Sequence, residues 1–451
     1  MGRITHFPSP TQIETRYSSW EQSLIRSLGA RTSWKLQIAL ATALCGVISW
    51  LFQGAFDDQN YFRFDSFYIL RTSLPTILTL ILLSLLVFHV PEKRRSLFLA
   101  ASFLTGSLIT LQPLVKLLPN MLLQFLTLIT LPSLVLLTWL YAKLSQNSDS
   151  PKRLTLLYSL FFWGLVLLPL ALFSRQVVTL HYTVLWLSKV PFLYLSAVTL
   201  VMQWRRIGAY SPSLFLNPAH AFRGALWPEE SGPAKNQQEY FETWWNGYLN
   251  LVLGFFLYGV ALSIHRLTGG FSTIFLSYLE FALTDIAVFN LLTGATRIFG
   301  FRIRDATSFV FLSLTPAETW RRGSVYNYRF ILRFVFFPIL RRLQSPIFAT
   351  IGAFTFFTIS HWGGSLILIM LTSSDLQNSF EYKLALGRLL QTLTYVATVY
   401  FSARYWFWSR TQLSSSARLQ WLSCLLTHAV YLAFTYLIYA KYLKLYDRFF
   451  F

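Results

Sequence analysis

Long runs of apolar residues alternate with short polar connections along almost the whole chain. A helix that crosses a lipid bilayer needs about 20 mostly apolar residues. Eleven segments meet this requirement: residues 36–52, 68–90, 96–113, 119–141, 154–173, 179–202, 247–264, 271–293, 346–372, 383–408 and 419–440. Because each segment is apolar on nearly every face rather than striped, the pattern predicts an all-α polytopic membrane protein, with residues 1–451 forming a single domain.

The composition agrees with a membrane protein. Of the 451 residues, 54% are hydrophobic and 12% are charged, whereas soluble domains carry about 25% charged residues. The net charge of +20 would suit a nucleic-acid partner only if the cations gathered on one soluble face. Here they alternate with apolar runs, so the sequence predicts membrane lipids rather than nucleic acid as the partner of these cations.

Lysine and arginine are unevenly divided between alternate connections. With the N-terminus in the cytoplasm, the inner connections hold 26 of these residues and the outer ones about nine. This bias predicts a cytoplasmic N-terminal segment at residues 1–35 and an inner loop at 203–246 that ends in Trp244 and Trp245. Residues 294–345 are both apolar and basic, which predicts short interfacial or re-entrant helices.

Ionisable residues inside apolar segments are the strongest functional signal, because each is costly in a bilayer unless it is paired or hydrated. His361 lies in the middle of one segment, just before Trp362 and the pair Gly363-Gly364. An imidazole away from water stays neutral and can accept a proton, as a general base does. The alternative is a histidine that is hydrogen-bonded between helices, with the glycines serving close packing.

Glu280 and Asp285 share another apolar segment. Five residues correspond to about 140° around a helix, so the two carboxylates do not share a face. The sequence favours structural ion pairs with the basic residues that follow, among them Arg297 and Arg302; a proton relay is the alternative.

Trp320-Arg321-Arg322 follows a helix-start signal, in which Thr315 is the N-cap, Pro316 the first helical residue and Glu318 the acidic partner of a capping box. The arginines suit either membrane phosphates or the phosphates of an anionic cofactor such as coenzyme A. No metal site is predicted, since Cys45 and Cys424 lie far apart inside apolar runs. No Walker loop, nucleophile elbow or dinucleotide fingerprint is present.

Three blocks of the second half resemble the membrane-bound O-acyltransferase (MBOAT) family, in its branch of bacterial alginate O-acetyltransferases and teichoic-acid D-alanyl transferases. The blocks are residues 280–301, which end in Gly300-Phe301-Arg302, residues 319–338, which begin with Thr319-Trp320-Arg321-Arg322, and the segment around His361. The resemblance implies an MBOAT-like core at residues 271–372. Ser324 stands where the family has a second histidine, and Asn327 is close to it in the sequence.

The resemblance implies a bacterial inner-membrane enzyme that moves an acyl group from acyl-CoA or another cytoplasmic acyl thioester to a hydroxyl of a cell-surface glycan, lipid or carrier. His361 would be the base, while Ser324 or Asn327 would orient the imidazole or the acyl oxygen. Trp320, Arg321, Arg322 and Trp362 would bind substrate. An acyl-carrier protein or an extracytoplasmic transferase is the implied partner. A non-catalytic MBOAT-like scaffold and a lipid or glycan transporter are the alternatives.

Overall fold

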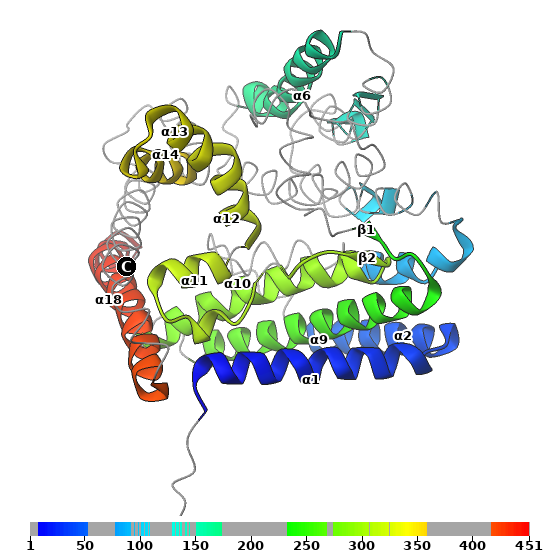
Figure 1. Ribbon diagram of the computed structural model, residues 1–451, viewed down its shortest axis with the longest axis horizontal. Coiled ribbons are helices and arrows are strands. Elements are labelled where there is room, and N and C mark those ends of the chain that lie inside the picture. Colours follow the sequence, from blue (N-terminus) through cyan, green and yellow to red (C-terminus); the bar gives the residue numbers. More distant parts are fainter. Residues whose placement is uncertain are drawn as a thin grey trace, which may run out of the picture. The chain divides into compact units, whose positions relative to one another are not determined.

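The computed structural model describes residues 8–52, 77–91, 150–173, 232–267, 274–305, 307–323, 325–358 and 416–450, with short pieces between residues 94 and 144. Of this described part, 86% is helical, which confirms the predicted all-α class for these residues (Figure 1). Its one sheet is a single antiparallel pairing of two-residue strands, in which Gly232 lies opposite Arg302 and Pro233 opposite Phe301.

The described elements are six long helices and a set of shorter helices and strands. The long elements are α1 (Pro10–Arg31), α2 (Trp34–Phe52), α6 (Pro151–Phe173), α9 (Gln237–Leu267), α10 (Ile274–Arg297) and α18 (Ala417–Phe450). The short ones are η2 (Val87–His89), β1 (Gly232–Pro233), β2 (Phe301–Arg302), η4 (Val310–Leu312), α11 (Pro316–Gly323), α12 (Val325–Ile331), the π-helical η5 (Leu332–Phe336), α13 (Phe337–Leu343) and α14 (Pro346–Thr358).

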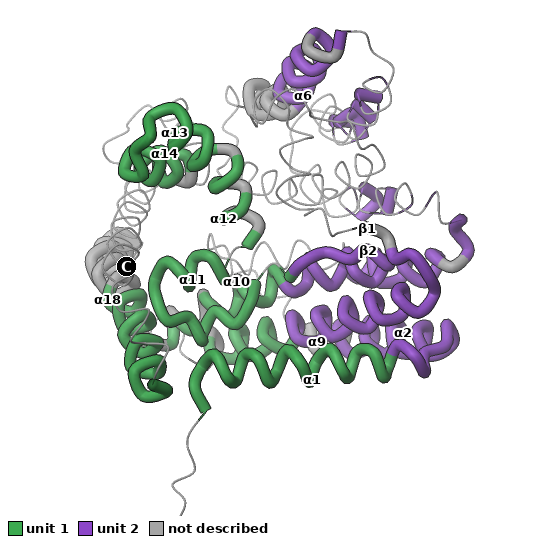
Figure 2. The backbone as a smooth tube through the Cα atoms, in the orientation of Figure 1, with its two compact units in different colours: residues 1–28, 256–289, 305–451 green, residues 29–255, 290–304 purple. Residues whose placement is uncertain are grey.

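The chain divides into two compact units (Figure 2). Unit 1 contains residues 1–28, 256–289 and 305–451, and unit 2 contains residues 29–255 and 290–304. Unit 2 holds a core of fully buried apolar side chains, which include Trp244, Phe299 and Phe301. In unit 1 the short helices α11 to α14 contact one another in series, and α11 and η4 also contact α18.

Two glycines allow α9 and α10 to approach closely in unit 2. A Cβ atom on Gly294 would lie 2.7 Å from the carbonyl oxygen of Gly247 and 2.9 Å from the backbone nitrogen of Leu251. A Cβ atom on Gly247 would lie 2.7 Å from the backbone nitrogen of Ile298. Because these neighbours are backbone atoms and cannot move alone, only glycine fits at this crossing.

We therefore expect Gly247→Ala and Gly294→Ala each to lower the free energy of unfolding by about 1–3 kcal/mol, the usual effect of overpacking. Gly259→Ala is the matched control on α9, since a Cβ atom there meets nothing within 4 Å, and alanine should be neutral or slightly stabilising at that position. Thermal denaturation of the purified protein in detergent measures both effects. Equal melting temperatures for all three variants would contradict the close crossing.

The predicted polar segments 1–35 and 203–246 contain more helix than the sequence alone indicated. The C-terminal boundary of the predicted loop 203–246 is wrong, because α9 begins at Gln237 and carries Trp244 and Trp245 into a buried position. Residues 203–231 of this loop lie outside the described residues. Within the polar segment 1–35, Pro10–Arg31 form the 22-residue helix α1, and α2 begins at Trp34. Within the segment 294–345, η4, α11, α12, η5 and α13 form the series of short helices that the mixture of apolar and basic residues predicts, whereas residues 294–297 are the end of α10.

The described helices do not establish a number of membrane spans. Among the described residues, one helical stretch, Gln237–Ile264, is long and apolar enough to cross a membrane, and 39% of its most apolar window is buried. Helices α2, α6, α10 and α18 coincide with predicted segments. The predicted segments 179–202 and 383–408 lie wholly outside the described residues, and segments 68–90, 96–113, 119–141, 271–293 and 346–372 lie partly outside them.

Candidate functional site

The predicted catalytic residues are mostly outside the described part of the chain. His361, Trp362 and Ser324 lie outside the described residues, and for Asn327 the description covers the backbone of α12 but not the side chain. Trp320, Arg321 and Arg322, which were predicted to bind substrate, lie on α11 and are described in full. The described part of the candidate site is therefore α11 and the elements that contact it.

Helix α11 begins with the predicted capping arrangement. The hydroxyl of Thr315 accepts a hydrogen bond of 3.1 Å from the backbone N–H of Glu318. The carboxylate of Glu318 reaches back and accepts a hydrogen bond of 2.8 Å from the backbone N–H of Leu314. With Pro316 at the first helical position, where no N–H is needed, the start of this helix is fixed by local sequence alone.

Arg322 is a buried cation between two carboxylates. Its guanidinium lies 2.8 Å from Glu14 of α1 and 2.9 Å from Glu318, and only 10% of its side chain is exposed. Burial by itself would raise the pKa of Glu318, but the nearby charge of Arg322 and the hydrogen bonds from Leu314 and Arg322 lower this pKa below its ordinary value. Arg322 therefore holds α1 and α11 together, and its charge is already balanced.

Arg321 has a different environment from its neighbour. It contacts Glu318 at 3.1 Å, but 51% of its side chain is exposed, so its charge remains accessible to an anion. The sequence grouped Arg321 and Arg322 as one anion-binding pair. The structure separates them, because the helical turn directs one into the protein and the other to the surface.

Trp320 connects α11 to the helix that leads toward His361. Its ring stacks on Phe354 of α14, with centroids 5.3 Å apart and an interplanar angle of 28°. The ring of Tyr328 on α12 makes an edge-to-face contact with the ring of Trp320, with the two centroids 5.4 Å apart. Because α14 is described as far as Thr358, this contact brings the Trp-Arg-Arg motif against the helix that comes immediately before the His361 segment in the sequence.

A polar stripe on α18 binds the backbone on the other side of α11. The hydroxyl of Ser423 donates a hydrogen bond of 2.6 Å to the backbone carbonyl of Leu314. The hydroxyl of Tyr431 donates one of 2.8 Å to the backbone carbonyl of Pro316. The thiol of Cys424 and Nε2 of His428 each lie 3.1 Å from the carbonyl oxygen of Phe311. These side chains were not among the predicted site residues, although their helical spacing within an otherwise apolar segment is a signal that the sequence contains.

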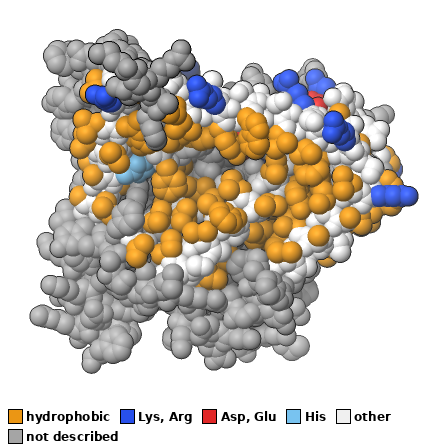
Figure 3. Space-filling model, turned by 90° about the horizontal axis from the view of Figure 1, so that it is seen from below, with side chains coloured by type: hydrophobic (Ala, Val, Ile, Leu, Met, Phe, Trp, Pro, Cys, Tyr) orange, Lys and Arg blue, Asp and Glu red, His pale blue; other side chains and the backbone are white. Residues whose placement is uncertain are grey.

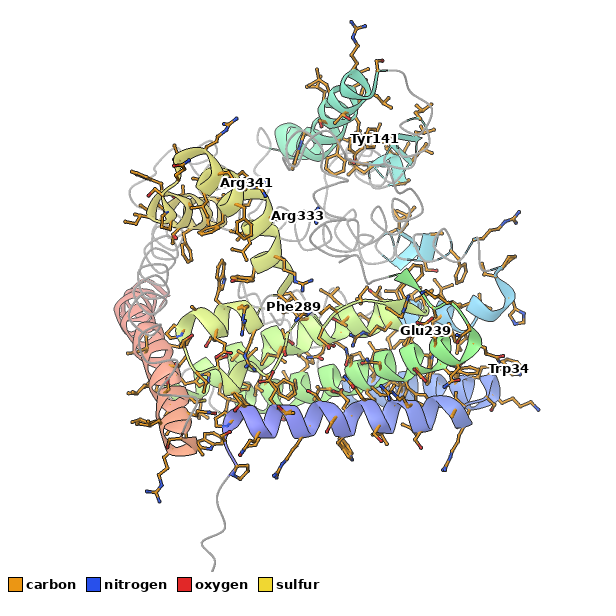
Figure 4. The ribbon with its side chains drawn as sticks, in the orientation of Figure 1. Trp34, Tyr141, Glu239, Phe289, Arg333 and Arg341 are labelled. Carbon is orange, nitrogen blue, oxygen red and sulfur yellow. The ribbon has the colours of Figure 1, made fainter. Side chains whose placement is uncertain are left out.

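The predicted ion pairs are only partly visible. The side chains of Glu280 and Asp285 lie outside the described residues. Arg297 donates to the side chain of Asn246 on α9 at 2.7 Å and to the carbonyl of Ile303 at 2.6 Å. Arg302 pairs at 2.5 Å with Glu239, which lies in the first turn of α9 (Figure 4). The structure thus gives Arg302 a carboxylate partner on α9, which the sequence analysis had not considered.

No model of a known protein family matches the chain, and no curated protein sequence matches it. Among the described residues, no three histidine, cysteine, aspartate or glutamate side chains come together in a way that could hold a metal ion.

Proposed function

We propose that the chain is a polytopic membrane O-acyltransferase of the MBOAT type. The membrane part of this proposal is supported by large apolar side chains that are exposed on the long helices, among them Val47 on α2, Phe161 on α6, Phe256 on α9 and Leu425 on α18. Figure 3 shows how densely hydrophobic side chains cover the described surface on one side. Such surfaces are costly in water and are favourable against lipid.

The stacking of Trp320 on Phe354 is the observation that carries the enzymatic part of the proposal. In the sequence, residues 339–356 separate the block at 319–338 from the block around His361. This contact joins the block that begins at Thr319 to the helix that precedes His361. A site assembled from these blocks requires such proximity.

In the proposed reaction, His361 removes the proton from an acceptor hydroxyl, and the resulting oxygen attacks the carbonyl carbon of the acyl thioester. The carbon–sulfur bond breaks, and the leaving thiolate takes the proton back from the imidazolium, so that the base is regenerated. Ser324 or Asn327 would orient the imidazole or the acyl oxygen. Trp362 and Trp320 would line the substrate path.

The donor in this proposal is acyl-CoA or an acyl-carrier protein thioester on the cytoplasmic side. Arg321, whose side chain is half exposed, would contact its phosphates, whereas Arg322 would act only structurally. The acceptor is a glycan, lipid or carrier at the bacterial cell surface, with an extracytoplasmic transferase as a partner that relays the acyl group.

We expect membrane vesicles that contain the protein to consume acyl-CoA and to move its label to a membrane-bound or soluble hydroxyl acceptor. The test uses acetyl-CoA and palmitoyl-CoA with radiolabelled acyl groups, and it measures both thiol release and label transfer. Vesicles from cells that lack the protein serve as the control. If neither donor is consumed above this control, with crude cell-envelope glycans and lipids supplied as acceptors, the proposal fails.

A further inference from the structure

Helices α13 and α14 form a tight hairpin within unit 1. Gln344 has a left-handed backbone conformation, with φ of 49°, and its N–H closes α13 by donating to the carbonyl of Leu340 at 2.8 Å. The helices pack so closely that a Cβ atom on Gly352 would clash with the side chain of Ile339. The turn between them is therefore fixed by the packing of the two helices and by this cap.

Large apolar side chains surround this turn and are exposed. On the α13 side Leu343 is 58% exposed, and on the α14 side Phe348 is 59% exposed; Ile347 and Ile351 are exposed beside it. Residues 347 and 351 are one helical turn apart, so they lie on one face of α14. Leaving such apolar surface in water instead of burying it costs about 25 cal/mol of free energy per Å².

Two arginines lie next to these apolar side chains. Arg341 and Arg342 occupy the last turn of α13 and are both exposed; Figure 4 labels Arg341 on this helix. The sequence contains no acidic residue between Glu318 and Asp375, so no carboxylate is close to these arginines in the sequence. Basic residues at a helix C-terminus interact favourably with the helix dipole, but the dipole does not explain the exposed apolar side chains around them.

We infer that the tip of this hairpin binds an anionic phospholipid. The phosphate of the headgroup contacts Arg341 and Arg342, and the acyl chains lie against Leu343, Ile347 and Phe348. The inference rests on the membrane location in the proposed function and not on acyl transfer. In the predicted topology the hairpin tip comes where an inner connection meets the segment 346–372, so the lipid belongs to the cytoplasmic leaflet, whose anionic lipids attract basic residues at the membrane surface.

The test compares the thermal stability of the purified full-length protein in detergent with increasing amounts of phosphatidylglycerol, phosphatidylcholine or inorganic phosphate. We expect phosphatidylglycerol to raise the melting temperature more than phosphatidylcholine, and phosphate alone to have no effect. In Arg341→Gln/Arg342→Gln the apparent Kd for phosphatidylglycerol should weaken by about 30-fold, since each basic residue near an anionic surface contributes about a factor of five.

Two further variants separate charge from hydrophobic contact. Arg16→Gln/Arg26→Gln removes two exposed arginines of α1 and should keep the preference for phosphatidylglycerol. Leu343→Gln/Phe348→Gln should weaken the binding of both lipids alike. The inference is overturned if phosphatidylcholine or free phosphate stabilises the wild-type protein as well as phosphatidylglycerol does, or if the Arg341/Arg342 variant keeps its full response. No acyl donor enters this measurement, so its outcome is independent of the enzymatic proposal.

Discussion

Replacing His361 with alanine is expected to lower the rate of acyl transfer by about 10²–10⁴-fold, the usual contribution of a positioned general base. The hydroxyl of an acceptor is a weak nucleophile until its proton is removed, and the proposal requires that His361 is neutral and able to accept that proton. The measurement is label transfer from acyl-CoA in vesicles that contain equal amounts of each protein. The melting temperature should change little, because the loss is chemical.

His428→Ala is the matched control for this prediction. His428 also lies in a predicted apolar segment, but its Nε2 contacts the backbone carbonyl of Phe311, a bond that serves packing. Loss of this one hydrogen bond is expected to cost about 1 kcal/mol of stability and to leave most of the transfer activity. If His361→Ala keeps wild-type transfer, His361 is not the base, and a scaffold or transporter becomes the better proposal.

Local signals in the sequence account for the starts of three helices. The capping box at Thr315 and Glu318 was predicted from the sequence and is present. The same signature occurs at Ser9 and Gln12, and with asparagine as the cap at Asn236 and Glu239, where the expected hydrogen bonds also form. Applying the rule to Asn236 would have ended the loop 203–246 at the correct residue, because a capping residue directly before a long apolar run marks a helix start.

Partners that are distant in the sequence could not be predicted in the same way. Glu14 and Arg322 meet at 2.8 Å, but a single sequence contains no signal that one of several glutamates approaches one of many arginines. The polar stripe on α18 is visible as a pattern, whereas its partners are backbone carbonyls near Phe311 and Pro316 that any residue would offer. Packing decides such contacts, and it depends on the whole fold.

Glu318 and Glu239 show how a local signal and a distant contact combine. Each glutamate accepts a hydrogen bond from the backbone N–H that precedes its capping residue, at 2.8 Å for Glu318 and 2.6 Å for Glu239. Each also pairs with an arginine, Arg322 and Arg302 respectively. The hydrogen bond at the helix start restricts the glutamate side chain, so less side-chain entropy is lost when the ion pair with the arginine forms.

Replacing Arg322 with methionine is expected to lower the free energy of unfolding by about 3–5 kcal/mol, since the change removes the buried guanidinium that Glu14 and Glu318 share and leaves the mostly buried Glu318 with only the exposed Arg321. Methionine keeps an unbranched side chain that covers the position of the aliphatic part of arginine, so most of the loss reports the missing guanidinium charge. Arg321→Met is the matched control on the next residue. Because the Arg321 side chain is 51% exposed, its ion pair with Glu318 should contribute about 1 kcal/mol or less. Denaturation of both variants in detergent measures the difference.

The same variant should change the dependence of stability on pH. The pKa of Glu318 is lowered in the folded protein from an ordinary value of 4.5, so the ion pair stabilises the fold fully above pH 4.5, and this contribution is lost as the pH falls through the lowered pKa. The gap in melting temperature between the wild type and Arg322→Met should therefore be widest near neutral pH and should narrow in acid. A gap that stays constant from pH 7 to pH 3 would show that Arg322 acts through packing, since protonating Glu318 removes the charge that Arg322 balances and leaves its contacts in place.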